Sequence, residues 1–281
     1  MSRIDLHTHS TVSDGTDTPG ELMRKAADAN LDVVALTDHD STDGWAEAAI
    51  VAETVGITLV PGMELTTMLN GQVVHILGYL FDPDFGPLAA EIARIRNERL
   101  TRAERMVERI SDQFDLSWDD VLRQTADGTT VGRPHIADAL IERGYFPDRP
   151  AAFKTVLSSD SPFYVAHYAP DPITGIQLIR DAGGVPILAH PAGAHRTPLI
   201  DPPLITTLAT AGLAGFEADH RENTDAGKKV LRREARVHDL VLTGASDYHG
   251  AGKPNQLGEN LTSISALERI ISEGTVLPLF A

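Results

Sequence analysis

The stretch RIDLHTHSTVSDG lies near the start of the sequence, at residues 3–15, and the prediction of the whole fold begins from it. Its short apolar run predicts a buried β-strand that ends in His7 and His9. Because side chains two residues apart on a strand point to the same face, both imidazoles can reach one cation. Asp14 follows in the loop after this strand. The stretch therefore predicts a first strand that delivers metal ligands at its carboxyl end.

Six further apolar runs continue this pattern along the chain. They lie at residues 32–40, 57–65, 72–80, 185–191, 214–219 and 240–249. Their β-branched content predicts buried strands, and helical patterns separate most of them, beginning with residues 18–30. Strands that alternate with helices indicate parallel pairing and an α/β architecture. Seven such strands favour a closed or nearly closed barrel over an open sheet.

The segment at residues 83–167 interrupts this alternation. It contains a long helical pattern, then Ser117 and Asp120 in the spacing of a capping box, then another helical pattern. We therefore expect two parts: a metal-binding barrel formed by residues 1–82 and 168–281, and a small helical insert between them.

The long helical pattern of the insert carries six arginines between Arg94 and Arg109, interspersed with glutamates. Two interpretations compete: a solvated helix face covered by ion pairs, or a surface that binds anions. Interspersed charges of both signs are more often a solvated face, so we expect this helix to be exposed and ion-paired.

Composition and charge limit the classes of function. The chain has 281 residues with 40 acidic and 24 basic side chains, which gives a formal net charge of -16. This charge would repel a long polyphosphate, so general nucleic-acid binding is disfavoured. Cys is absent, which fits a reducing compartment and leaves His and carboxylates as metal ligands. Neither a signal peptide nor a span of about 18 apolar residues is evident, so we expect a cytoplasmic protein without membrane contact.

Side chains that bind metals stand at the ends of the predicted strands with unusual regularity. A single His on a strand is more often structural, but chance does not explain donors at the ends of six strands. The donors are His7, His9, Asp14, His39, Glu64, His75, His190, Asp247 and His249. Because the carboxyl ends of parallel barrel strands meet at one face, we expect these side chains to converge on one metal site.

The motifs DLHTHSTVSDG, LTDHD, PGMEL, VHILGY, ILAHP and SDYHG together resemble those of the polymerase-and-histidinol-phosphatase (PHP) family. The resemblance extends from residue 3 to about residue 257, and the insert falls where a stand-alone subgroup of the family carries a small helical one. It implies a metal-dependent phosphoesterase on a distorted seven-stranded α/β barrel, the (β/α)7 PHP barrel. It also implies that coordinating residues fill all nine ligand positions of the family.

By this resemblance, the nine donors would hold three divalent cations. His7, His9, Glu64 and Asp247 would hold the first; Glu64 would bridge to the second, completed by His75 and His190; Asp14, His39 and His249 would hold the third. Imidazoles together with carboxylates suit Mn²⁺, Fe²⁺ or Zn²⁺ better than Mg²⁺. Such cations bind a phosphate, activate water as hydroxide and neutralise the leaving oxygen. Asp38 is expected to support its neighbour rather than to ligate.

Substrate-binding residues are expected outside the nine donors. Arg133 and His135 begin a predicted helix in GRPH, where helix starts favour anions and an Arg can clamp a second phosphate; a surface turn is the alternative. His220 ends another strand and has two interpretations, contact with the leaving group or a structural role. A further candidate is His195. The candidate catalytic residues are Asp14, His39, Arg133, His135 and His220.

The resemblance implies a phosphatase that acts on small phosphorylated nucleotides. The complete donor set, the helical insert and the GRPH motif are most similar to those of enzymes that remove the 3′-phosphate from nucleoside 3′,5′-bisphosphates. Close relatives of these enzymes trim short RNA from its 5′ end. Alternatives are an AMP phosphatase, a histidinol-phosphate phosphatase, and a metal-binding structural or regulatory PHP module. Hydrolases of amide and lactam bonds also begin with HxH, but no Lys ends a predicted strand, and Lys253 fits no phosphate-binding P-loop. No obligate protein partner is predicted.

Overall fold

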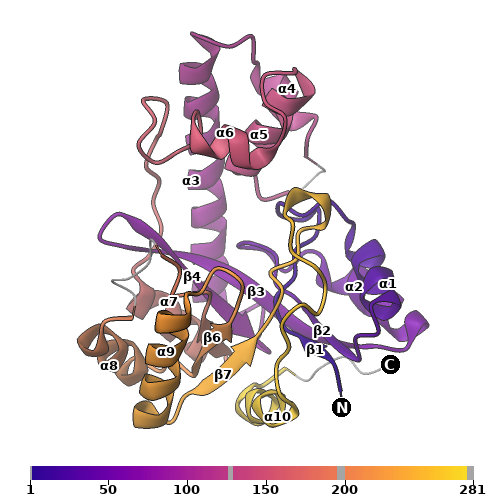
Figure 1. Cartoon of the computed structure of the whole chain (residues 1–281), viewed down its shortest axis with the longest axis vertical. Coiled ribbons are helices and arrows are strands. Elements are labelled where there is room, and N and C mark those ends of the chain that lie inside the picture. The colour runs from indigo at the N-terminus through magenta and orange to yellow at the C-terminus, as the bar shows by residue number, and fades with distance from the viewer. Residues whose placement is uncertain (1, 126–128, 195–199, 277–281) are drawn as a thin grey trace.

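The computed structural model describes residues 2–125, 129–194 and 200–276 of the chain. Figure 1 shows a broad barrel-like body with a smaller helical part standing above it. The helical part is the interruption that the sequence predicts. Within the described residues, none of the helices is both long and apolar enough to cross a membrane.

Seven strands form the body, in the order of the sequence. They are β1 (Ile4–Asp5), β2 (Val33–Leu36), β3 (Thr58–Leu69), β4 (Gln72–Tyr79), β5 (Val185–Leu188), β6 (Gly215–Asp219) and β7 (Val241–Gly244). Beyond the two end strands, Thr8 bridges Tyr248, and the backbone N–H of His9 donates to the Tyr248 carbonyl at 2.8 Å. The sheet is therefore nearly closed, which confirms the predicted seven-stranded barrel with a helical insert.

The expectation of parallel pairing is wrong for one strand. β4 pairs antiparallel with both β3 and β5, whereas β1–β2–β3 and β5–β6–β7 are parallel. The cause is the two-residue turn between β3 and β4, where Asn70 and Gly71 both have positive φ, at 50° and 79°. An Asn-Gly pair with this geometry joins adjacent strands as a hairpin instead of a helical crossover.

Helices cover the outside of the barrel, and most begin at a side-chain cap. They are α1 (Pro19–Asp28), α2 (Trp45–Val55), α7 (Pro172–Asp181), α8 (Pro202–Thr210), α9 (Asp225–His238) and α10 (Ile264–Glu273). Thr18 forms a capping box with Glu21, and Asp171 accepts hydrogen bonds from the backbone of α7. A cap of this kind stabilises a helix by about 1 kcal/mol, and it fixes where the preceding loop ends.

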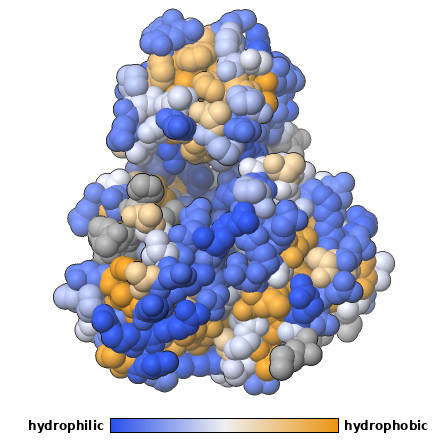
Figure 2. All heavy atoms as spheres, viewed as in Figure 1, coloured by the Kyte–Doolittle hydropathy of each residue, from blue (hydrophilic) through white to orange (hydrophobic). Residues whose placement is uncertain are grey.

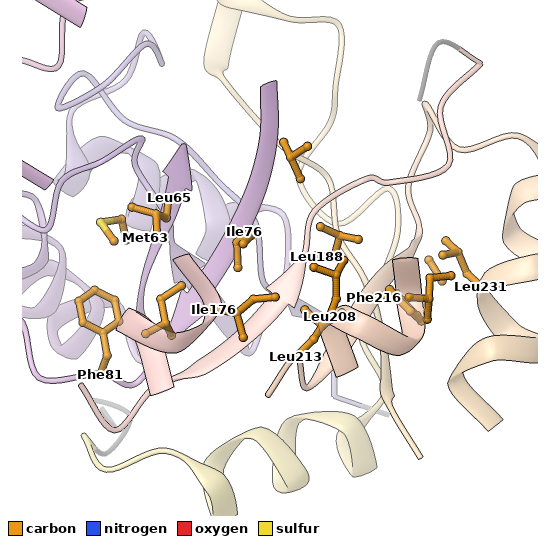
Figure 3. Packing of buried hydrophobic residues seen from close by; sticks show 14 of the residues in the cluster. Met63, Leu65, Ile76, Phe81, Ile176, Leu188, Leu208, Leu213, Phe216 and Leu231 are labelled. Carbon is orange, nitrogen blue, oxygen red and sulfur yellow. The ribbon is translucent and has the colours of Figure 1, made fainter. Parts of the chain in front are cut away.

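One hydrophobic layer lies between the sheet and the helices. Figure 3 shows Ile76 of β4 and Ile176 of α7 side by side, with Phe216 of β6 and Leu231 of α9 packed further along the same layer. All four side chains are completely buried, and each contributes about 1.5–3 kcal/mol on transfer from water. A second layer inside the barrel includes Tyr79, whose hydroxyl donates to the Leu6 carbonyl at 2.7 Å.

The insert has a hydrophobic core of its own. It consists of α3 (Gly86–Ser111), α4 (Trp118–Leu122), α5 (Arg133–Glu142) and α6 (Arg149–Lys154). Ser117 and Asp120 form the predicted capping box at the start of α4. Leu88 and Ile95 of α3 pack in the hydrophobic layer between the sheet and the helices of the barrel, whereas Met106 packs in the core of the insert. The long helix α3 therefore joins the two parts, and Figure 2 shows the surface hollowed between them.

Candidate metal centre

His7 and His9 lie directly after β1, at the barrel edge where the parallel strands end. Both are completely buried, and their Nε2 atoms are 3.0 Å apart. They project to the same side because one residue separates them in an extended backbone. Asp247, which follows β7, brings Oδ1 to 3.4 Å from His7 Nε2 and 3.3 Å from His9 Nε2. The first and last strands thus supply one shared group of donors.

Glu64 places its two carboxylate oxygens on different groups of histidines. Its Oε2 lies 3.2 Å from His7 Nε2, 3.1 Å from His9 Nε2 and 3.2 Å from His39 Nδ1. The backbone explains this position, since the N–H of Glu64 donates to the carbonyls of Thr37 and Asp38, just before His39. A carboxylate shared in this way can bridge two cations.

The other carboxylate oxygen of Glu64 faces two different histidines. Its Oε1 lies 2.9 Å from His75 Nδ1 and 3.2 Å from His190 Nε2. His75 reaches this point because β4 runs antiparallel, so that the first half of β4 lies at the edge where the parallel strands end. His75 pairs with Thr66, two residues beyond Glu64 on β3.

Asp14 forms the third part of the cluster. Its Oδ1 lies 3.1 Å from His249 Nε2, 3.7 Å from His9 Nδ1 and 3.9 Å from His39 Nε2. The rings of His9 and His249 stack with centroids 4.0 Å apart. The structure therefore brings all nine predicted donors into one cluster, and His9 belongs to both the first and the third group.

Four sets of donor atoms lie within 4.8 Å of one another among the described residues. These are His7, His9, Glu64 and Asp247; His9, Asp14, His39 and His249; His39, Glu64 and His75; and His7, His190 and Glu217. The first two sets contain the first and third predicted groups. His75 and His190 share no common set, but both contact Glu64 Oε1, and their rings meet edge to face with centroids 5.6 Å apart.

Two observations fit this cluster to divalent cations. Within the described residues, the buried atoms His39 Nδ1, His75 Nδ1, His249 Nε2 and Asp247 Oδ1 make no hydrogen bond of normal geometry, although a polar atom of another donor lies within 3.4 Å of each. Buried polar atoms are normally satisfied, so these need an occupant. In addition, His190 and Asp247 have positive φ values of 29° and 53°, a conformation that is uncommon outside Gly and often marks functional sites.

The protonation states of several donors also favour cation binding. Burial raises the pKa of Glu64, but His75, His39 and His7 outweigh it and hold this pKa well below its usual value. Burial lowers the pKa of His39 well below its usual value, and burial with the His9 and Lys253 charges lowers that of His249 to about 4. At neutral pH Glu64 is thus ionised and His39 and His249 are neutral, the forms in which these side chains bind metals.

Two carboxylates orient the cluster from outside. Glu217 of β6 is buried, lies 2.9 Å from His7 Nδ1 and accepts a 2.7 Å hydrogen bond from the backbone N–H of His190. A carboxylate on the second nitrogen fixes the direction of a ligating imidazole. Asp38 accepts hydrogen bonds from Ser10 and Ser13 instead, and so shapes the loop that carries Asp14. The sequence analysis missed Glu217, although it lies within the predicted strand at residues 214–219.

A cleft of about 550 Å³ opens above the cluster, between the barrel and the insert. Asp14, His39 and His75 line its floor, and Arg99, Arg102 and Arg133 line its side formed by the insert. Arg99 donates to Asp40 at 2.7 Å, Arg102 to the Val165 carbonyl at 2.7 Å, and Arg133 to the Leu157 carbonyl at 2.9 Å. These bonds hold three positive charges above the donors.

The expectation of a solvated face on α3 is therefore wrong for Arg99 and Arg102. Arg102 is buried, and burial together with the nearby Arg133 charge lowers its pKa to about 10. Burial and the same arginines lower the pKa of His167 to about 3, so this neighbour stays neutral. Like charges confined together in a partly buried cleft are relieved by an anion, which makes this side of the cleft suited to phosphate.

The structure also places two other predicted candidates, His135 and His220, and one residue that was not proposed for the site, Lys253. His135 does not line this cleft; it is buried at the start of α5, where its Nδ1 accepts from the Gly132 N–H at 3.1 Å. His220 is buried behind the donors, with Nε2 3.7 Å from Asp247 Oδ2. Lys253, which the sequence analysis set aside, lines the cleft and contacts the same Oδ2 at 2.7 Å. His195 lies outside the described residues.

Comparison with known proteins gives this arrangement a family. The sequence pattern of the PHP domain matches residues 5–77. A Haemophilus influenzae protein named 5′-3′ exoribonuclease is 34% identical over 270 residues, which cover 94% of this chain and 96% of that protein. The chain belongs to the PHP family. It is therefore a metal-dependent phosphoesterase, a hydrolase whose donor clusters can bind metal ions.

Two further relatives cover nearly the whole PHP chain. A Chromobacterium violaceum protein named 3′,5′-nucleoside bisphosphate phosphatase is 32% identical over 254 residues, or 90% of this chain and 89% of that protein. A solved structure from Bifidobacterium adolescentis, described as a candidate metal-dependent phosphoesterase, is 40% identical with a TM-score of 0.95. The match covers 98% of both chains, so the insert as well as the barrel is shared with this protein.

Proposed function

We propose that this chain removes the 3′-phosphate from nucleoside 3′,5′-bisphosphates at a centre of three divalent cations. One observation carries the proposal: the donor cluster and three arginines face each other across a single cleft. Its volume of about 550 Å³ suits one nucleotide. A substrate with two phosphates can place one at the donor cluster and the other at the arginines, whereas a simple monoester can occupy only one side of the cleft.

Three groups of donors would hold the cations. His7, His9, Glu64 and Asp247 would hold the first; Glu64, His75 and His190 would hold the second; Asp14, His39 and His249, next to His9, would hold the third. Mn²⁺, Fe²⁺ or Zn²⁺ suits these donors. When bound, such ions lower the pKa of water at the site and neutralise the charge of the leaving oxygen.

The side chains of the protein provide the positioning. Glu217 holds His7 in the orientation for ligation, and Lys253 neutralises the outer oxygen of Asp247. Arg133 lies over the rings of Phe153 and Tyr164, 5.2 and 5.8 Å from their centroids, and lines the cleft as a clamp for the second phosphate. The name of the Chromobacterium relative supports this choice of substrate.

The test uses adenosine 3′,5′-bisphosphate and the Mn²⁺-loaded enzyme. We expect release of inorganic phosphate and formation of adenosine 5′-monophosphate, identified by chromatography. Arg133→Ala should lower kcat/KM for the bisphosphate at least about tenfold, because a charge-assisted hydrogen bond is lost. The same variant should leave kcat/KM for adenosine 3′-monophosphate, which lacks the clamped phosphate, almost unchanged.

Arg105→Ala is the matched control, because Arg105 belongs to helix α3 of the same insert, is exposed, and is not among the residues that line the cleft. It should behave as the wild type with both substrates. Absence of phosphate release from the bisphosphate would refute the proposed substrate. Equal losses on both substrates in Arg133→Ala would refute the clamp.

A second candidate function is 5′-3′ exonuclease activity on short RNA. The observation in its favour is an adjoining cavity of about 1070 Å³ that shares Arg149, Pro150 and Lys253 with the cleft and leaves room for a longer substrate. Digestion of a 5′-phosphorylated RNA of a few nucleotides into nucleoside monophosphates would support it. We propose that the protein acts in the cytoplasm, the location that the sequence predicts.

A further inference from the structure

The loop that carries Asp14 is held by the insert as well as by the barrel. On the barrel side, Ser13 is fixed by Asp38 at 2.6 Å. On the other side, three donors of the insert hold backbone carbonyls of the loop. These are Thr129 Oγ1 to Thr11 O at 3.0 Å, Thr130 N to Val12 O at 3.0 Å, and Arg149 Nη1 to Asp14 O at 2.8 Å. The insert therefore docks on the loop of a candidate cation ligand.

Arg149 makes the contact nearest to the cation donors, and its guanidinium is firmly held. Its Nε and Nη2 bind the two carboxylate oxygens of Asp138 at 2.7 and 2.6 Å, which leaves Nη1 for the Asp14 carbonyl. The Arg149 side chain is only 11% exposed. On its other side lies Gly252, where an added Cβ would collide with the guanidinium. A fork of this kind needs the planar geometry of Arg and is not reproduced by Lys.

The position of the Asp14 backbone decides where the Asp14 carboxylate can go. That carboxylate reaches His249 at 3.1 Å, whereas His9 and His39 stand at 3.7 and 3.9 Å. A short side chain has little freedom to recover this geometry if its backbone shifts. The hydrogen bonds from Arg149 of α6, which Asp138 of α5 holds in place, therefore affect the donor group that contains Asp14. They do not contact the donor groups that contain Glu64.

We propose that Arg149, locked by Asp138, is a positioning residue for Asp14, and that the docked insert thereby sets the affinity of the third cation position. The inference rests on the proposed three-cation centre. It gives the insert a role beyond covering the cleft, because the insert then controls whether the third cation is held.

A matched comparison exists within the insert. Arg143 also forks a carboxylate, with Nη2 2.7 Å from both oxygens of Asp120 and Nη1 2.8 Å from Asp115. These partners of Arg143 all belong to the insert, and the Asp14 loop is not among them. Loss of the Arg143 fork therefore weakens the insert without touching the cation donors.

The experiment is a Mn²⁺ titration of the metal-free protein, with unbound Mn²⁺ measured by electron paramagnetic resonance. For the wild type we expect three bound ions. Arg149→Lys should weaken one of the three at least about tenfold and leave two as in the wild type, since losses of 10–100-fold are typical when partners of metal ligands are removed. Arg143→Lys should keep all three affinities. Circular dichroism melts report whether each variant is folded.

Asp138→Asn is the second variant, because it keeps Arg149 and removes only the anchor of the fork. It should weaken the same single ion, and it decides the question if Arg149→Lys does not fold. A folded variant that binds all three ions with wild-type affinity would overturn this inference but not the proposed centre. A uniform loss of affinity for all three ions would do the same. A wild-type protein that binds fewer than three ions would overturn the proposed centre and the inference with it.

Discussion

Glu64 is the residue on which the largest number of donors depends. Its two oxygens lie within 3.2 Å of five imidazole nitrogens, those of His7, His9, His39, His75 and His190. A buried carboxylate surrounded in this way is held in one orientation, and it can belong to two cations at once. At the scale of single residues, the centre is built around Glu64, with Asp14 added from one side.

The protonation of His7 and His9 leads to a pH prediction. Burial lowers the pKa of His9, but Asp247 and Glu64 outweigh it and raise this pKa to about 9; Glu217, Glu64 and Asp247 likewise raise the pKa of His7 well above its usual value. The His7–His9 pair, whose Nε2 atoms lie 3.0 Å apart, thus carries at least one extra proton in the metal-free protein at pH 7. A ligating imidazole must lose its proton, so Mn²⁺ binding should release protons.

The sign of this effect follows directly. Protons compete with Mn²⁺ below the raised pKa values, so affinity should increase as the pH rises from 6 toward 9. Calorimetry at pH 7 in buffers of different ionisation enthalpy measures the number of protons released. A binding enthalpy that does not vary with the buffer, together with a pH-independent affinity, would contradict the prediction.

Most of the residues at the centre could be predicted from the sequence, and the reason is local. Metal donors at strand ends need only a strand pattern and a residue type, which is how all nine were found. Glu217 and Lys253 were missed because their importance depends on what faces them across the barrel. His135 illustrates the opposite case, since a helix start that suits an anion here uses the imidazole to cap its own helix.

At the scale of elements, the β3–β4 hairpin is the decisive departure from a regular α/β barrel. It turns β4 around and brings His75 beside Glu64 instead of at the far edge. The Asn-Gly signal for this turn was present in the sequence, but the alternation of strands and helices elsewhere favoured parallel pairing throughout. The expected exposure of Arg99 and Arg102 was wrong for a related reason. Helix periodicity shows which side chains of α3 share a face, but it does not show which part of the protein that face packs against.

Helix α7 packs closely on this hairpin, and that contact can be tested. A Cβ added at Gly175 would lie 2.7 Å from Thr67 Cγ2 and 3.3 Å from Leu65 Cδ2. Gly175→Val should therefore destabilise the protein by about 1–3 kcal/mol through overpacking. Urea unfolding followed by circular dichroism measures the free energy of unfolding.

Gly86→Val serves as the control, because a Cβ at Gly86 would have no neighbour within 4 Å. Its effect should stay within about 0.5 kcal/mol. If both valine variants unfold at the same urea concentration, the close packing of α7 on β3 does not contribute to stability as described.

At the scale of the whole molecule, the centre joins the two ends of the chain. His7 and His9 follow the first strand and Asp247 follows the last, and the Thr8–Tyr248 bridge closes the barrel between them. The donors can therefore assemble only after the barrel has formed. The insert adds charge from above with Arg99, Arg102 and Arg133, which offsets the acidic character of the chain at the point where phosphate has to bind.

The most direct test of this centre is anomalous X-ray diffraction from crystals of the protein grown with Mn²⁺. The proposed three-cation centre predicts three anomalous peaks within the donor cluster, with neighbouring peaks about 3.5–4 Å apart. Two of them should contact the carboxylate of Glu64, and the third should contact Asp14. Crystals that bind Mn²⁺ only at other positions, with no peak at Glu64, would contradict the account.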